Sequence, residues 1–166
     1  MSDIESEEQN NGANRIYTLK VYIVAGQLSE EWEGKEISRK IEIRGDQTLE
    51  KLHSIIFEAF DRWERHSYEF NLGEGPHDRS EIYSPQEAKG GLEEFKDEGD
   101  TEETTLDSLG LKEGRAFGYI FDHGANWIHQ IDVVSVDKTG TEGEGDEKYP
   151  RVVDRVNESP PQYPER

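Results

Sequence analysis

Four polar side chains in the sequence could bind a metal ion or transfer protons: His53, His66, Asp122 and His129. Imidazole and carboxylate groups are suitable ligands for zinc, manganese or iron, and they also act as general acids and bases. No two histidines have the HxxxH or HxH spacing that would place two ligands on one face of an element. A small-ligand or metal-dependent enzyme using these four residues is therefore an alternative that only the tertiary fold could assemble, and the sequence assigns no catalytic residue, metal ligand or cofactor.

Each of these residues also has a structural explanation. His53 lies at the border of an apolar helical stripe, and His66 follows the helix, where an imidazole can interact with the helix dipole. His129 lies in mid-strand on the same face as Trp127, where a core histidine bonded to a backbone carbonyl is the default. Asp122 adjoins a hairpin turn, in which acidic and amide side chains are common.

Large aromatic side chains near the predicted element ends offer a second kind of site, because an aromatic group with an exposed edge can anchor a peptide or ligand. Aromatic residues at strand and helix spacing also serve as core residues. With the proline-rich C-terminal end, they favour a non-enzymatic protein- or peptide-binding module whose surface lies around Trp127 and His129. The candidate partner surface comprises His53, His66, Tyr68, Asp122, Trp127 and His129.

The sequence lacks the familiar catalytic motifs. It has no glycine-rich loop leading from a strand into a helix, no P-loop and no GxSxG pattern. Cysteine is absent, which excludes disulfides, thiolate metal sites and a cysteine nucleophile. These absences favour a binding protein over an enzyme.

The charge balance is strongly acidic, with 38 acidic and 19 basic residues and a net charge of −19. Such a surface repels phosphate backbones and anionic lipid, so nucleic-acid binding is disfavoured. No run approaches the roughly 18 apolar residues that a membrane span needs, and the N-terminal residues do not resemble a signal peptide. We therefore expect a cytoplasmic protein without a membrane partner, and the sequence does not indicate an oligomeric state.

The strongest periodic signal is an amphipathic helix over residues 48–63. Thr48 can cap its start, and Glu50 in the first turn favours the positive end of the helix dipole. The apolar stripe recurs at a period of 3.6 residues and comprises Leu49, Leu52, Ile55, Ile56, Ala59, Phe60 and Trp63. The opposite, polar face includes Arg62. Such a helix must pack against a sheet.

Alternating apolar and polar residues predict strands at residues 16–24, 36–43, 67–72, 116–122 and 127–136. The first two form the simplest antiparallel pair, and residues 123–126 make a hairpin turn between the last two. Residues 105–110 predict one helical turn. This order indicates an α+β fold: a β-grasp-like (ubiquitin-like) mixed sheet packed on one main helix.

We expect a single domain over residues 15–166, preceded by a disordered acidic tail at residues 1–14. Within it, residues 73–103 predict an irregular acidic loop with a short element near residues 81–83, and residues 138–148 predict a flexible loop. Residues 149–166 hold four of the six prolines and should run extended along the surface.

Several segments, taken in order, resemble the plasmid pRiA4b ORF-3-like family, whose fold is also known as MM3350-like. They are YTLKVYIV at the first strand, GDQTLEKLHSIIFEAFD at the helix, HSYEF at residues 66–70, FDHGANWIH at residues 121–129, and the closing YPR and ESPPQ. The resemblance covers residues 16–165. His123 and Ala125 replace the family's usual Phe and second Asp in the hairpin, and the frequent C-terminal cysteines are absent.

The resemblance implies a shared fold without an activity, because the family is uncharacterised and a fold does not establish function. Some members carry a resolvase label. This sequence has no basic DNA-binding arm and is strongly acidic, so it does not support that role.

Overall fold

The computed structural model describes residues 15–26, 28, 32, 34–76, 78–85, 99–138 and 149–162. The predicted acidic tail at residues 1–14 lies outside the described residues, as do His77 and residues 86–98 of the predicted acidic loop. Most of the predicted flexible loop, residues 139–148, and the last four residues also lie outside them.

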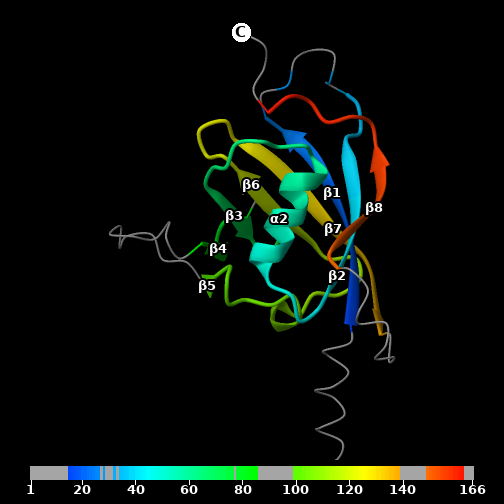
Figure 1. Cartoon of the computed structure of the whole chain (residues 1–166). Coiled ribbons are helices and arrows are strands. Elements are labelled where there is room, and N and C mark those ends of the chain that lie inside the picture. The colour runs from blue at the N-terminus through cyan, green and yellow to red at the C-terminus, as the bar shows by residue number, and fades with distance from the viewer. Residues whose placement is uncertain are drawn as a thin grey trace, which may run out of the picture.

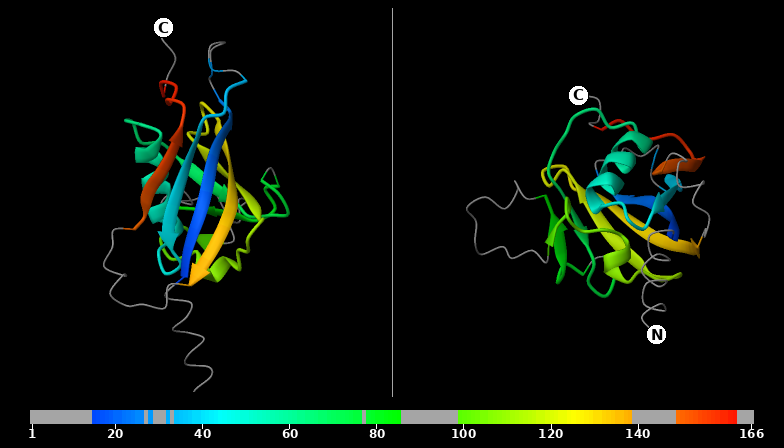
Figure 2. Two further views of the ribbon diagram at one scale, coloured as in Figure 1. Left: turned by 90° about the vertical axis from the view of Figure 1, so that its right-hand side faces the viewer. Right: turned by 60° about the horizontal axis from the view of Figure 1, so that its bottom comes forward.

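In the described residues the architecture is α+β, with one α-helix lying against one face of an eight-stranded mixed sheet (Figures 1 and 2). The strands are β1 (Arg15–Ala25), β2 (Ser38–Arg44), β3 (Tyr68–Asn71), β4 (Ile82–Ser84), β5 (Gly99–Asp100), β6 (Ala116–Phe121), β7 (Trp127–Lys138) and β8 (Arg151–Val156). Their order in the sheet is β5-β4-β3-β6-β7-β1-β2-β8. Neighbouring strands are antiparallel except β4 and β5, which are parallel.

The five predicted strands are therefore confirmed as β1, β2, β3, β6 and β7, and the first two do form an antiparallel pair. The short element expected near residues 81–83 is β4. The predicted helical turn is the 3₁₀-helix η3 (Asp107–Leu109), which ends at Gly110 with a left-handed φ of 67°. The α+β class is established, whereas the finer β-grasp-like assignment stays a prediction.

The helix α2 (Leu49–Ala59) starts as predicted: the side chain of Thr48 accepts a hydrogen bond from the backbone N–H of Lys51 at 3.2 Å. It ends four residues earlier than the predicted residue 63. Asp61 has a positive φ of 57°, and Trp63 lies beyond the helix, 67% exposed. The apolar stripe therefore stops at the helix C-cap, and Trp63 does not belong to it.

The early end has a physical cause at the last turn of α2. In a longer helix the carbonyl of Ala59 would accept the N–H of Trp63. Instead that carbonyl accepts Arg39 Nε at 2.8 Å and Arg155 Nη1 at 2.9 Å. The Trp63 N–H donates to the side chain of Gln162 at 2.8 Å. Partners far away in the sequence thus take both groups that would have extended the helix.

The C-terminal segment contributes an edge strand, β8, which pairs with β2. Residues 149–166 were expected only to run extended along the surface, because proline cannot donate a ladder hydrogen bond. Residues 151–156 contain no proline, however, so the backbone is free to pair between Pro150 and Pro160.

The core lies between α2 and the sheet face that it covers. Leu49, Leu52, Ile56 and Ala59 of the helix are at most 1% exposed. Two rows of side chains cross the sheet beneath it: Tyr68, Phe121 and Trp127 are register partners, as are Phe70, Tyr119 and His129. Within the described residues, no helix is long and apolar enough to cross a membrane.

Candidate functional site

A cavity of about 630 Å³ lies between α2 and the segment that leads into β3. The helix contributes His53 and Phe57, which lie one turn apart on one side. The chain after the helix contributes His66 and Tyr68. Three of the six predicted site residues, His53, His66 and Tyr68, therefore line one cavity.

His53 forms the inner wall of the cavity. Its ring stacks on Tyr68 with the centroids 3.6 Å apart and an angle of 3° between the planes, and its Nδ1 lies 2.6 Å from the Tyr119 hydroxyl. Burial, with a smaller effect of the Arg65 charge, lowers the pKa of His53 to about 3, so the imidazole is neutral at pH 7. Burial also raises the pKa of Tyr119 well above its usual value. The Tyr119 hydroxyl therefore keeps its proton and can donate a hydrogen bond to His53.

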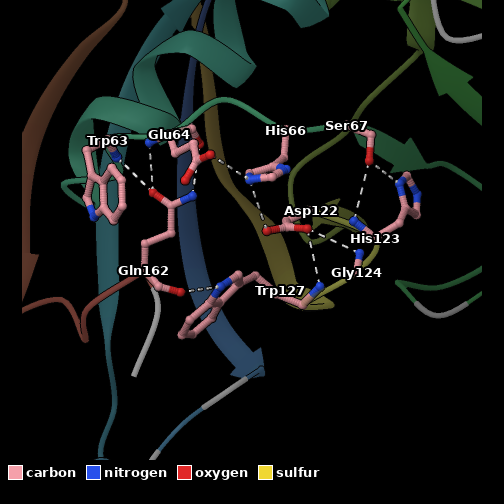
Figure 3. A network of polar contacts seen from close by, with 10 residues as sticks. Trp63, Glu64, His66, Ser67, Asp122, His123, Gly124, Trp127 and Gln162 are labelled. Atoms are coloured by element: carbon pink, nitrogen blue, oxygen red, sulfur yellow. Dashed lines mark hydrogen bonds and ion pairs between the residues drawn. The ribbon is translucent and has the colours of Figure 1, made fainter. Parts of the chain in front are cut away.

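His66 connects the cavity to the last hairpin (Figure 3). Its Nε2 lies 3.7 Å from Asp122 Oδ2 and 3.9 Å from Glu64 Oε2. Asp122 is 6% exposed, and its Oδ1 accepts the backbone N–H groups of Gly124 and Ala125 at 3.1 and 3.2 Å. The turn thus holds the carboxylate in place, and the carboxylate lies beside the imidazole. An imidazole beside a carboxylate is an arrangement that general acid–base catalysis uses.

Trp127 and His129 lie in the interior, at 0% and 1% exposure, rather than on a partner surface. Trp127 Nε1 donates to the backbone carbonyl of Gln162 at 3.2 Å, so the C-terminal segment covers the indole (Figure 3). His129 Nδ1 lies 3.3 Å from the backbone carbonyl of Tyr119, as expected of a core histidine. The surface expected around Trp127 and His129 is therefore buried in this structure. The sequence could not show this, because it does not reveal which segment covers these strands.

Gln162 holds this cover in place. Its Oε1 accepts the backbone N–H groups of Trp63 and Glu64 at 2.8 and 3.0 Å, and its Nε2 donates to the Glu64 carbonyl at 2.8 Å (Figure 3). The side chain is 1% exposed. These bonds join the C-terminal segment to the loop after α2, and the sequence contains no signal for them.

Arg62 is also buried, at 7% exposure, although the helical pattern placed it on the polar face. Because α2 ends before it, its guanidinium turns inward and lies 4.3 Å from the Trp127 ring centroid and 5.7 Å from that of Phe121. Burial lowers the pKa of Arg62 to about 10, so it stays charged at pH 7. Among the described residues, neither Nη atom of Arg62 nor Nε2 of His129 has a hydrogen-bond partner. Cation–π contacts with the aromatic rings stabilise the charge instead.

A second polar series runs beside the hairpin turn. Ser67 Oγ lies 2.7 Å from His123 Nδ1, and His123 Nε2 lies 2.9 Å from Glu69 Oε1. Burial raises the pKa of Glu69, but hydrogen bonds from His123 and from Arg79, at 2.7 and 2.8 Å, outweigh that effect and lower it. With its proton on Nε2, His123 donates a hydrogen bond to the ionised Glu69, and its Nδ1 accepts one from the Ser67 hydroxyl. The sequence interpretation missed this series because His123, in the hairpin turn, meets Ser67 and Glu69 of the β3 segment only in the tertiary fold.

The structure does not gather the four polar candidates into one set. His53 and His66 share the cavity, Asp122 contacts His66, and His129 faces the interior beyond Tyr119. In the part of the chain that is described, no group of three or more His, Cys, Asp or Glu side chains could hold a metal ion.

Comparison with known proteins places the whole fold in context. A family model described as "Plasmid pRiA4b ORF-3-like protein" matches residues 16–163. The crystal structure of the protein of unknown function MM3350 from Methanosarcina mazei Go1 is similar, with a TM-score of 0.59 and 21% sequence identity; the similarity covers 89% of this chain and 72% of that chain. At this identity the likeness shows the fold alone. No curated protein matches the chain.

Proposed function

The chain belongs to the plasmid pRiA4b ORF-3-like family, and from its cavity between α2 and β3 we propose that it is a non-enzymatic binding module of the cytoplasm. Its partner is a protein or peptide segment that carries positive charge and an apolar or aromatic side chain. The observation that supports this proposal is the combination of aromatic walls and an acidic rim in one open cavity.

The walls suit a flat or apolar side chain. His53 and Tyr68 stack and present a neutral aromatic surface, and the ring of Phe57 is partly buried beside them. Pro85 closes one side. A cavity of about 630 Å³ is within the range that holds a small ligand or a few peptide side chains. An aromatic anchor entering it would displace water from rings that are already held in position, so little ordering is required on binding.

The rim selects for positive charge. Glu50, Glu58 and Glu102 line the cavity against a single arginine, Arg65. The whole chain carries a net charge of −19, which accelerates the approach of a cationic partner and repels an acidic one. The site therefore replaces the surface expected around Trp127 while keeping the same class of partner.

A peptide-display selection tests the proposal, with two variants of exposed helix residues. Ser54→Trp fills the cavity, because Ser54 lines it, whereas Lys51→Trp adds the same ring to α2 outside the lining. We expect the wild type to select peptides rich in Lys or Arg with an aromatic residue. Binding of these peptides should weaken at least tenfold in S54W and stay unchanged in K51W. Selection of acidic peptides, or equal binding by S54W and wild type, would refute the proposal.

A second candidate is an enzyme acting on a small ligand, using His53, His66, Asp122 and His129 or the series beside them. The observation that favours it is the arrangement of Ser67, His123 and Glu69, which places a hydroxyl, a base and an orienting carboxylate in hydrogen-bond contact. A fluorophosphonate probe would label Ser67 if this serine is activated, and His123→Ala would abolish the labelling. Labelling of this kind would favour the enzyme over the binding module.

A further inference from the structure

A second cavity of about 780 Å³ lies at the other side of α2, between the end of the helix and β8. It shares no lining residue with the first cavity. Three cationic side chains line it, Lys35, Arg39 and Arg155, together with two carboxylates, Asp61 and Glu158. The described residues of the lining thus carry net positive charge, in a chain that has twice as many acidic as basic residues.

The two arginines are held side by side. Arg39 Nε and Arg155 Nη1 donate to the same oxygen, the carbonyl of Ala59, at 2.8 and 2.9 Å. Burial, followed by the charge of Arg155, lowers the pKa of Arg39, as expected for two like charges held close together. Among the described residues, no carboxylate forms an ion pair with either guanidinium within 4.0 Å.

The arginines differ in what they offer to a ligand. Arg39 is 2% exposed, and its donors bond to backbone carbonyls of β2 and β8 and to Ser159 Oγ at 2.8 Å. Arg39 therefore joins these segments and adds a fixed positive charge beside the cavity. Arg155 is exposed and lines the cavity, and among the described residues only its Nη1 has a hydrogen-bond partner, so Nε and Nη2 are left to bind a ligand. Lys35 is exposed too, with its ammonium 5.7 Å above the Trp32 ring centroid.

Stabilisation of the helix C-terminus explains one of these cations, because the last carbonyls of a helix favour positive charge. It does not explain three. Arg155 adds a second positive charge at a carbonyl already bonded to Arg39, and the two charges repel each other. Lys35 adds a third positive charge to the same cavity. Among the described lining residues, Asp61 and Glu158 offset this only in part. An anionic occupant would offset the remainder.

We propose that this cavity binds a small phosphate-bearing molecule, with the phosphate contacting Arg155 and Lys35 beside the fixed charge of Arg39. A guanidinium presents two parallel N–H donors that match phosphate oxygens, and the ammonium adds a point charge. The phosphate could be free inorganic phosphate or a monoester. Trp32 forms an aromatic part of the wall, which favours a monoester that carries a planar group, such as a nucleotide.

Titration calorimetry on the full chain at low salt tests the site with three probes: inorganic phosphate, phosphoserine and AMP. The key variant is Arg155→Gln. The matched control is Arg151→Gln on the same strand, which removes the same charge from an arginine that pairs with Glu42 outside the cavity. Lys35→Gln is a second test variant, which removes a charge from the cavity without removing a hydrogen bond to the Ala59 carbonyl. Thermal unfolding without ligand checks that each variant is folded.

We expect binding of at least one probe by the wild type, with affinity reduced about tenfold or more in R155Q and K35Q and unchanged in R151Q. Equal binding of all three probes identifies phosphate alone as the ligand group, and preference for AMP identifies a nucleotide. Absence of millimolar binding by all three probes overturns the proposal. So does equal weakening by R151Q and R155Q, because it would reflect net charge rather than a site.

Discussion

Acidification should destabilise this protein through His129, and the substitution His129→Phe should remove that effect. His129 is 1% exposed, and burial, with a smaller effect of the Arg62 charge, lowers its pKa to about 3. In the unfolded chain a histidine has a pKa of about 6.5. Because the folded-state pKa is the lower one, the unfolded chain takes up the proton first. The free energy of unfolding therefore falls as the pH drops below 6.5 and continues to fall until about pH 3.

The size of the effect follows from these two pKa values. At pH 5.5 protonation favours the unfolded chain by about RT ln 11, or about 1.4 kcal/mol, and at pH 7 by about 0.2 kcal/mol. Wild type should therefore lose about 1.2 kcal/mol more than His129→Phe between pH 7 and pH 5.5. This difference hardly changes if the folded pKa is 4 rather than 3, since both lie well below the pH range used.

Urea denaturation at pH 7.0 and 5.5, followed by circular dichroism, measures this difference. Comparing wild type with the variant cancels the titration of the other histidines. The control is Ile131→Val on the same buried face of β7, which should lower stability by about 0.5–1.5 kcal/mol at both pH values. Equal acid sensitivity of wild type and H129F would show that His129 does not carry the effect, and the reasoning from its burial would fail.

Three further substitutions test contacts that the structure reveals. Gln162→Ala removes three hydrogen bonds to the loop after α2 and should cost about 1–3 kcal/mol in urea denaturation; an unchanged midpoint would contradict the role of Gln162 as an anchor. Gly118→Ala brings a new Cβ against the carbonyl oxygen of Pro76 and should cost about 1–3 kcal/mol, whereas Gly75→Ala, which meets open space, should leave the thermal midpoint nearly unchanged. Thr48→Ala should cost about 1 kcal/mol and Thr48→Ser should restore most of it, because the hydroxyl caps α2.

Much of the fold is readable from local patterns. Alternation along β1, β2 and β7 reports which side chains face the core, and a 3.6-residue period does the same for α2. The start of the helix is equally local, because the Thr48 hydroxyl bonds a backbone group three residues on. Such signals need no knowledge of the rest of the chain.

The end of the helix is different. It depends on Arg39, Arg155 and Gln162, which take up the backbone groups of the last turn from distant positions in the sequence. The same early end turns Arg62 from the predicted polar face into the core. No local pattern of the helix records partners that arrive from other strands, so the predicted residue 63 was wrong.

The candidate site was likewise predicted in part from local sequence and decided in part by tertiary contacts. Residue types in the sequence single out His53, His66 and Tyr68 as side chains worth examining, and the faces of the helix and strands are set by local periodicity. Their meeting in one cavity, and the burial of Trp127 beneath the C-terminal segment, were decided by tertiary packing. A side chain's chemistry belongs to its own residue, but its exposure depends on whichever distant segment covers it.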